Sequence, residues 1–357
     1  MLLLQDMFPL LMLLKQRQRK TESNLVYLLS PITSSMLIMI SIVMTSFHVF
    51  GTPIRCIGDA RSRFTSDYIN EYCWTTSTFS TMSSNSVPFY PGEGVMGAEV
   101  VHHNYYQWMP MVLLCLAGLC VIPHMMWKYS EAGLMNSLVP SNTDSKVDMN
   151  ILQWEKVVLY SKGVANYFVR NFNSQHHIKY GQYNLLAEVM CFFIILAIIV
   201  ILQSFLKTFL QYCPLLLLHH LDTPLPISPE ERLFPILTKC SLHSFGPSGS
   251  TQTEDALCLL PVNMINQKVF VVIWLWLALL LIISVLVIVS SILTAHLPGL
   301  RRKVLSKQVG EKSASYMVCS LGDMLKYGDW LVISRLNSHF SPDVAKVILT
   351  ELKTKLN

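Results

Sequence analysis

The chain has 357 residues, of which 52% are hydrophobic and 14% are charged, and its formal net charge is +5. A soluble domain carries about 25% charged residues, so this chain has too few charges to cover a globular surface of its size. The composition excludes an ordinary soluble protein and indicates an integral membrane protein, and no nucleic-acid partner is expected.

Four apolar runs divide the chain. Each has about 19–25 residues, enough at 1.5 Å per residue for a bilayer core of about 30 Å, and a backbone inside a bilayer must satisfy its own hydrogen bonds. The sequence therefore predicts an all-α membrane protein with four transmembrane helices at 32–50, 109–127, 185–206 and 269–293. The remaining segments are 1–31, 51–108 (loop A), 128–184, 207–268 (loop B) and 294–357.

Basic residues orient the spans. Twenty of the 27 Lys and Arg residues fall in 1–31, 128–184 and 294–357, so these segments are predicted to be cytoplasmic. Both termini then lie inside a multi-pass plasma-membrane protein, and loops A and B lie outside.

Each outer loop carries two cysteines. Cys56 and Cys73 lie in loop A, and Cys240 and Cys258 lie in loop B. Thiols that occur as pairs on one side of a membrane indicate the oxidising extracellular face, which agrees with the charge distribution. Four cysteines allow three connectivities, and the spacing alone does not choose between them.

A polar stripe runs along the first predicted span. Ser34, Ser41, Thr45 and His48 fall within about 80° of one another on a helix of 100° per residue. Two interpretations remain open: the stripe lines an aqueous pore, or its small polar residues allow close packing between helices.

The second predicted span begins with Tyr105–Trp108, a sequence typical of the aromatic belt at a membrane interface. Pro123 near its other end removes a backbone donor and predicts a kink. His124 follows, and a lone histidine here is interpreted as a satisfied polar group rather than a ligand.

Two further features concern the cytoplasmic side. Glu188 in the third span is a functional candidate because it is an intramembrane carboxylate, although its place near the boundary also lets it reach water. The periodic apolar residues around 151–159 and in 343–356 predict helices that form a cytoplasmic domain.

The chain shows no nucleotide-binding loop, nucleophile triad or zinc motif. Its adjacent histidine pairs point apart on a helix or strand and make poor chelates. We expect no enzymatic activity, no cofactor and no metal site.

Motifs along the whole chain match one family in order. They are Gly51–Ile57 (GTPIRCI), Glu71–Trp74 (EYCW), Tyr105–Trp108 (YYQW), Phe234–Cys240 (FPILTKC), Gly246–Gly249 (GPSG) and Asp255–Cys258 (DALC). On these residues the chain resembles the innexins, the gap-junction proteins of invertebrates within the pannexin-like superfamily. It departs from the family pattern at Thr52, where an aspartate is usual, and at Met109–Pro110 after the YYQW signature.

The resemblance implies disulfides between the outer loops, pairing Cys56 with Cys258 and Cys73 with Cys240. It also implies that the N-terminal segment 1–31 forms a helix lining the pore funnel, and that Tyr105, Tyr106, Gln107, Trp108 and Pro123 are signature or interface residues. Cys213 of loop B has no evident partner and is predicted to be a free thiol.

The resemblance further implies a function. An octameric hemichannel of this chain, alone or with other innexins, would sit in the lipid bilayer and dock with the hemichannel of a neighbouring cell at a gap junction. Ions and small metabolites would pass passively. The alternatives are a non-junctional hemichannel that releases small solutes, and a non-conducting tetraspan adhesion or scaffold protein.

Overall fold

The structure is a computed structural model that describes residues 22–58, 64–82, 99–139, 151–206, 233–309 and 324–356. Most of the N-terminal segment, and Cys213, lie outside these residues. By its internal contacts the chain forms two compact units. Unit 1 comprises Met1–Ser30, Ile122–Phe192 and Ile283–Asn357, and unit 2 comprises Pro31–Val121 and Phe193–Ile282.

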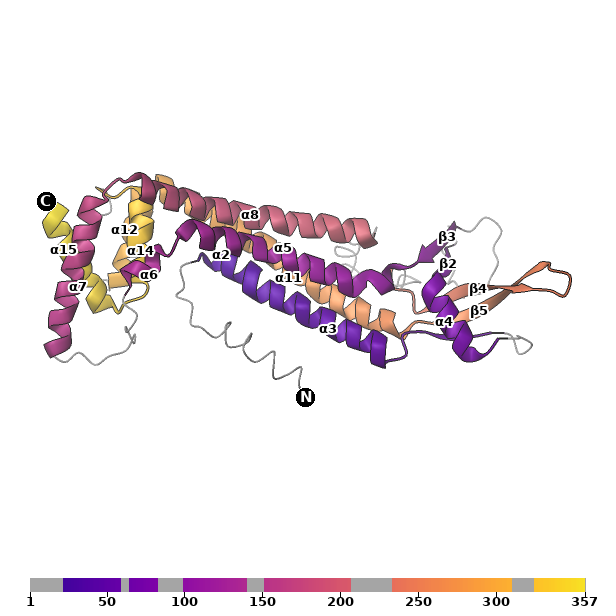
Figure 1. The fold of residues 1–357 in the computed structure, drawn as a ribbon. Coiled ribbons are helices and arrows are strands. Elements are labelled where there is room, and N and C mark those ends of the chain that lie inside the picture. Colours follow the sequence, from indigo (N-terminus) through magenta and orange to yellow (C-terminus); the bar gives the residue numbers. More distant parts are fainter. Residues whose placement is uncertain are drawn as a thin grey trace, which may run out of the picture. The chain divides into compact units, whose positions relative to one another are not determined.

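Among the described residues, four helical stretches are long and apolar enough to cross a membrane: Asn24–Phe50, Tyr105–Glu131, Gln175–Leu206 and Pro261–His296. The last three are helices α5, α8 and α11 (Figure 1). All four predicted spans are confirmed as helices, and each helix extends beyond its apolar run because backbone hydrogen bonding continues where the side chains become polar.

The first span is not a uniform helix. It consists of α2 (Asn24–Tyr27), a π-helical segment η1 (Leu28–Thr33) and α3 (Ser34–Phe50). Pro31 lies in the π-helical segment and cannot donate a backbone hydrogen bond, which accounts for a local departure from α-helical bonding. In unit 2, the indole N–H of Trp276 donates to Thr33 Oγ1 at 2.9 Å.

Loops A and B share one antiparallel sheet, which the sequence did not predict. Its strands are β1 (Arg55–Ile57), β2 (Thr78–Met82), β3 (Glu99–His103), β4 (Leu237–Phe245) and β5 (Thr251–Leu259), in the order β1-β5-β4-β2-β3. Strands of loop B thus lie between strands of loop A (Figure 1). A short helix, α4 (Ser66–Thr76), packs on one face of this sheet, and Thr65 caps its N-terminus.

Unit 1 contains the remaining helices. They are α6 (Leu134–Leu138), α7 (Ile151–Arg170), α12 (Pro298–Val309), α14 (Tyr327–Asn337) and α15 (Pro342–Leu356). Three of the helices that the structure describes begin at a proline, Pro261, Pro298 and Pro342, as expected where the first backbone N–H has no helical acceptor.

The prediction of helices around 151–159 and 343–356 is confirmed, and α7 and α15 lie side by side (Figure 1). The buried face of α7 differs from the apolar residues that suggested it. Val164, Ala165 and Phe168 are buried, whereas Trp154 and Leu159 are exposed. Periodicity identified the helix correctly but did not identify which of its faces is buried.

Candidate functional site

The four loop cysteines form the centre of unit 2's sheet-and-helix region. Cys56 of β1 is bonded to Cys258 of β5, its direct partner across the two strands. Cys73 of α4 is bonded to Cys240 of β4. The structure therefore contains both disulfides that the family resemblance implies, and each joins loop A to loop B.

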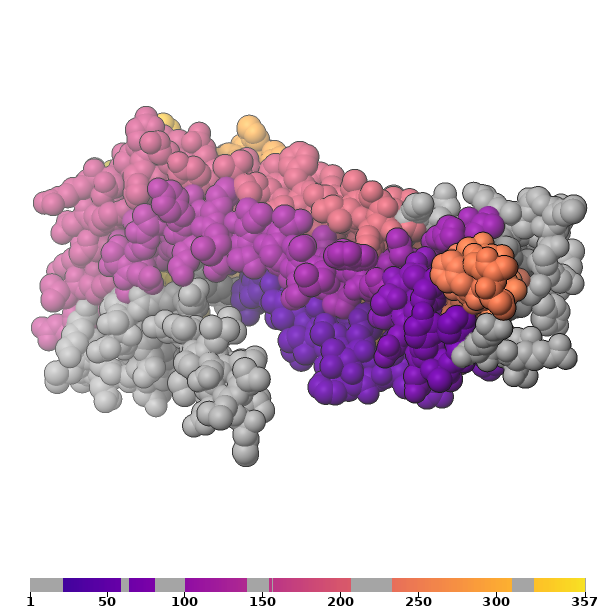
Figure 2. All heavy atoms as spheres, turned by 45° about the vertical axis from the view of Figure 1, so that its right-hand side comes forward, coloured from indigo at the N-terminus to yellow at the C-terminus, as the bar shows by residue number. Residues whose placement is uncertain are grey.

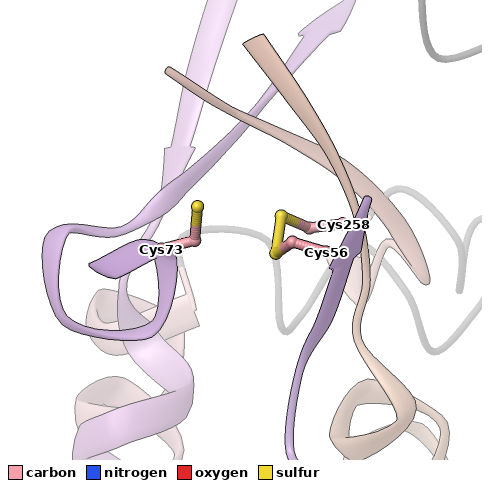
Figure 3. Close-up of side chains that lie close together, drawn as sticks. All are labelled: Cys56, Cys73 and Cys258. Atoms are coloured by element: carbon pink, nitrogen blue, oxygen red, sulfur yellow. A yellow bond between two sulfur atoms is a disulfide. The ribbon is translucent and has the colours of Figure 1, made fainter. Parts of the chain in front are cut away.

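The two disulfides lie close together. The sulfur atoms of Cys56, Cys73 and Cys258 are all within 4.8 Å of one another, and these side chains are buried (Figure 3). Cysteine binds a metal as a thiolate, and sulfurs held in disulfides carry no such charge. This cluster is consequently a covalent core between the two loops rather than a metal centre.

The YYQW signature anchors the end of α4 to the start of α5. Tyr106 is buried and its ring lies 4.7 Å from that of Trp74. The side-chain amide of Gln107 donates to the backbone carbonyl of Trp74. Trp108 is exposed, as a belt residue would be. The signature thus connects the disulfide core to the second span through Trp74, a residue not among the predicted site residues.

Pro123 lies inside α5, which continues as one helix from Tyr105 to Glu131. His124 follows it, and its Nδ1 lies 2.6 Å from Glu22 Oε1. The histidine is therefore a paired polar group, as the sequence suggested. Pro110, the departure from the family pattern, provides a carbonyl that accepts a hydrogen bond from Ser41 Oγ at 2.9 Å.

The polar stripe of α3 faces the interior of unit 2 at Ser34 and Ser41 only. Ser34 and Ser41 are buried, and the hydroxyl of Ser41 is bonded to α5. His48 is half-buried with its ring 5.3 Å from Trp74, whereas Thr45 is exposed and donates to the Ser41 carbonyl. The burial of Ser34 and Ser41 favours helix packing over pore lining. On the opposite side of α3, Ser35, Met39 and Ser46 are exposed.

A buried polar network joins α14 to the span ends of unit 1. Glu188 is buried, and its Oε1 accepts from Asn184 Nδ2 at 3.1 Å. The Asn184 side-chain oxygen in turn accepts from Arg335 of α14, whose guanidinium lies 5.1 Å from the centre of the Trp127 ring. Glu188 is thus enclosed by protein, which disfavours the alternative that it reaches water.

About two turns of α8 before Asn184, His177 lies between two partners. Its Nδ1 is 2.6 Å from Asp329 Oδ1 on α14, and its Nε2 is 3.0 Å from the hydroxyl of Tyr167 on α7. Burial, with the charge of Asp329, raises the pKa of Tyr167. This network was not predicted from the sequence, because His177 and Asp329 lie 152 residues apart in the chain.

The cysteines of the spans are dispersed. Cys115 is exposed on α5, and Cys120 and Cys191 are buried. The latter two agree with the use of cysteine as a small packing residue.

His103, at the end of β3, is a buried titratable group of loop A. Its Nε2 is 2.7 Å from Ser80 Oγ on the paired strand β2. Burial lowers its pKa to about 4, with a smaller contribution from neighbouring His102. The folded loop therefore holds this imidazole in its neutral form at physiological pH.

Acidification is expected to destabilise the loop region through His103. Between about pH 6.5 and pH 4 the unfolded chain binds a proton that the folded chain excludes, so stability falls as the pH falls, by about 3 kcal/mol at most. Thermal unfolding of the purified protein across this range measures the effect. His103→Gln should flatten the pH dependence, whereas His102→Gln should leave most of it, because burial is the larger cause of the low His103 pKa. Identical pH profiles for the wild type and His103→Gln would contradict this assignment.

These features define a class. The four candidate spans among the described residues and the two disulfides between loops A and B make the chain a tetraspan membrane protein with covalently linked loops. The innexin family model matches residues 23–356, and the chain belongs to the innexin family. Innexins are the gap-junction channel subunits of invertebrates.

Individual relatives agree with this placement. The chain is 31% identical over 355 residues to innexin inx2 of Drosophila melanogaster, covering 97% of this chain and 94% of the relative. It is 30% identical over 347 residues to innexin inx2 of Schistocerca americana, covering 94% and 93%. Innexin inx3 of Drosophila melanogaster is 28% identical over 318 residues, covering 87% of this chain and 78% of the relative.

Proposed function

We propose that copies of this chain form an octameric hemichannel that docks with a second hemichannel across the gap between two cells. Its wide aqueous pore passes ions and small metabolites without chemistry. Family membership supports the channel function, and the single observation that supports docking is the pair of disulfides between loops A and B. A docking surface whose loops are already ordered loses little conformational entropy on contact.

The charge distribution supports an orientation with both termini in the cytoplasm. Of 27 Lys and Arg residues, twenty lie in the segments containing the two termini and the middle loop. Loops A and B then lie outside, where disulfides persist. The helices α7, α12, α14 and α15 of unit 1 form the cytoplasmic domain in this arrangement.

Recording from paired cells tests the proposal. Each cell of a pair expresses only this chain, and each is voltage-clamped separately. Current that flows between the cells in proportion to their voltage difference supports docking. Dye uptake by single expressing cells without such current favours the non-junctional hemichannel, and neither response at normal surface expression favours the scaffold alternative.

We infer that the exposed side of α3, marked by Ser35, Met39 and Ser46, faces the pore. Ser46→Cys and Ser41→Cys make a matched pair, because both replace a serine of α3 and the two positions lie about 140° apart on the helix. A membrane-impermeant charged thiol reagent is expected to change the conductance of Ser46→Cys channels and to leave Ser41→Cys channels unaffected. Modification of Ser41→Cys alone would reverse the assignment.

A further inference from the structure

The sheet and α4 together form a two-layer loop domain, composed of β1, α4, β2, β3, β4 and β5 in unit 2. Side chains of a strand alternate between the two faces of a sheet. Cys56, Cys240, Leu242, Ala256 and Cys258 point to the α4 side and are buried in one cluster. The alternate residues of β1, β4 and β5 point away from α4, and the burial patterns of these strands show that side to be the more exposed.

That outer side carries a continuous apolar patch. Ile57 is 75% exposed, and Leu237, Leu257 and Leu259 are 40–43% exposed. Strand register places Ile57 opposite Leu257 and Leu237 opposite Leu259, so the four side chains occupy three adjacent strands. A contiguous aliphatic patch of this kind on a domain outside the bilayer marks an interaction surface.

Two basic residues border the patch. Arg55 is the register partner of Leu259 and is exposed, and Lys239 is the register partner of Leu257 and is half-buried. We call these six residues, Arg55, Ile57, Leu237, Lys239, Leu257 and Leu259, the sheet face. It is apolar in the middle and carries two positive charges, and Asp255, the next residue of β5 on this side, is an exposed carboxylate beyond it.

The exposed side of α4, on the other layer of the domain, has the opposite character. The rings of Phe64, just before α4, and of Tyr68 and Tyr72 stack in a row, with centres 5.1 and 6.1 Å apart. Tyr68 is exposed, whereas Phe64 and Tyr72 are partly buried against the disulfide core. Asp67 and Glu71 are exposed beside them. We call these five residues the helix face. Figure 2 shows the loop A surface beside the β4–β5 hairpin, drawn in purple and orange respectively.

The sheet face and the helix face are complementary in charge, and both carry apolar groups. One offers aliphatic side chains and two positive charges, and the other offers aromatic rings and two negative charges. Within the described residues the chain has two ion pairs, His124–Glu22 and His177–Asp329, and neither uses a charge of these faces. The sheet face and the helix face lie on opposite layers of one domain, so a contact between the sheet face of one copy and the helix face of another is head-to-tail. Head-to-tail contacts that close on themselves make a ring.

We propose that the sheet face of each subunit packs on the helix face of the next copy of this chain around the hemichannel. This inference rests on the proposed function for the existence of a ring, and it adds the surfaces that hold the ring together outside the membrane. Aliphatic residues between the faces lose contact with water, and the four charges at the border set the direction of the contact.

Charge reversal tests the contact in a way that a folding defect cannot reproduce. The sheet-reversed variant carries Arg55→Glu and Lys239→Glu, and the helix-reversed variant carries Asp67→Lys and Glu71→Lys. Each variant alone opposes like charges at every subunit contact, and we expect a loss of ring-sized complexes of roughly tenfold or more. Native gel electrophoresis and light scattering of detergent-extracted protein measure the ring.

Co-expression of the two variants is expected to restore the ring. An alternating ring then places a reversed sheet face against a reversed helix face at one contact and two native faces at the next. Asn104→Glu adds a charge at an exposed position on neither face and should assemble like the wild type. Peptide mapping confirms that every variant retains both disulfides. Assembly of either variant alone, or failure of the mixture, overturns the proposal.

Photo-crosslinking identifies the neighbour directly. A photoreactive phenylalanine analogue in place of Ile57, in the full-length protein in cell membranes, should form dimers whose adduct lies in the peptide containing α4. An adduct to lipid, to the same chain or to the sheet face of another copy overturns the contact.

Paired-cell current separates the two proposals. Rings that are held by this contact but carry no current between cells would refute docking alone. Current between cells that no charge reversal changes would refute this subunit contact alone.

Discussion

Replacing both Cys73 and Cys240 with serine is expected to lower the free energy of unfolding of the loop domain by about 3–4 kcal/mol and to abolish current between paired cells. While Cys56–Cys258 remains, the second disulfide still closes a ring made of the stretches 56–73 and 240–258, and a ring of that size gives this magnitude. Thermal unfolding of the purified protein and paired-cell recording measure the two effects. Unchanged current would show that one bridge orders the loops sufficiently.

A single cysteine substitution is expected to disturb the disulfide pairing more than the double substitution does. In Cys240→Ser, the thiol of Cys73 remains within 4.8 Å of the Cys56 and Cys258 sulfurs. Its thiolate attacks Cys56 Sγ, so that a Cys56–Cys73 bond forms and Cys258 leaves as a thiolate, with no net oxidation. The single variant should therefore contain mixed pairings. Peptide mapping under non-reducing conditions detects them, and a uniform Cys56–Cys258 bond would contradict this exchange.

The spans were predictable because the membrane imposes a local rule. A helix in hydrocarbon needs about 20 apolar residues in succession, and that pattern is readable without tertiary knowledge. The start of α11 at Pro261 and of α15 at Pro342 follows from equally local chemistry, because proline is favoured at the first position of a helix. Disulfide pairing was not local, and only the family resemblance selected Cys56–Cys258 from three connectivities.

The sheet of loops A and B was not predicted, and the reason is physical. β1 has three residues and pairs with β5, whose residues lie about two hundred positions later in the chain. Such pairing depends on the cross-linked loops being brought together, and the local pattern of so short a strand carries almost no information.

The polar stripe of α3 shows a different limit. Periodicity correctly grouped Ser34, Ser41, Thr45 and His48 on one side of the helix, but it does not say what that side touches. The structure places Ser41 against the Pro110 carbonyl of α5, so the Ser41 hydroxyl bonds to a neighbouring helix, although the stripe also suggested contact with water. In a membrane protein both environments favour small polar residues, and sequence alone does not separate them.

The contact between α8 and α14 leads to the last prediction, in which Gly328→Ala is expected to disrupt unit 1. A Cβ at Gly328 would lie 2.1 Å from the His177 carbonyl oxygen, which belongs to the backbone of α8 and cannot rotate away. The helices would have to separate at the point where His177 meets Asp329, and α14 is buried along most of its length. We expect a loss of about 3 kcal/mol or more in stability.

Gly163→Ala is the matched control. It makes the same chemical change in α7, where nothing lies within 4 Å of the new Cβ, so it should raise stability by about 0.5–1 kcal/mol through helix propensity. Thermal unfolding of both variants, with surface expression and paired-cell current, checks the pair. Loss of current in Gly328→Ala with preserved assembly of the spans would show that the packing of α14 on α8 is required for a working channel. If Gly328→Ala behaves like Gly163→Ala, the close approach of α14 to α8 is refuted.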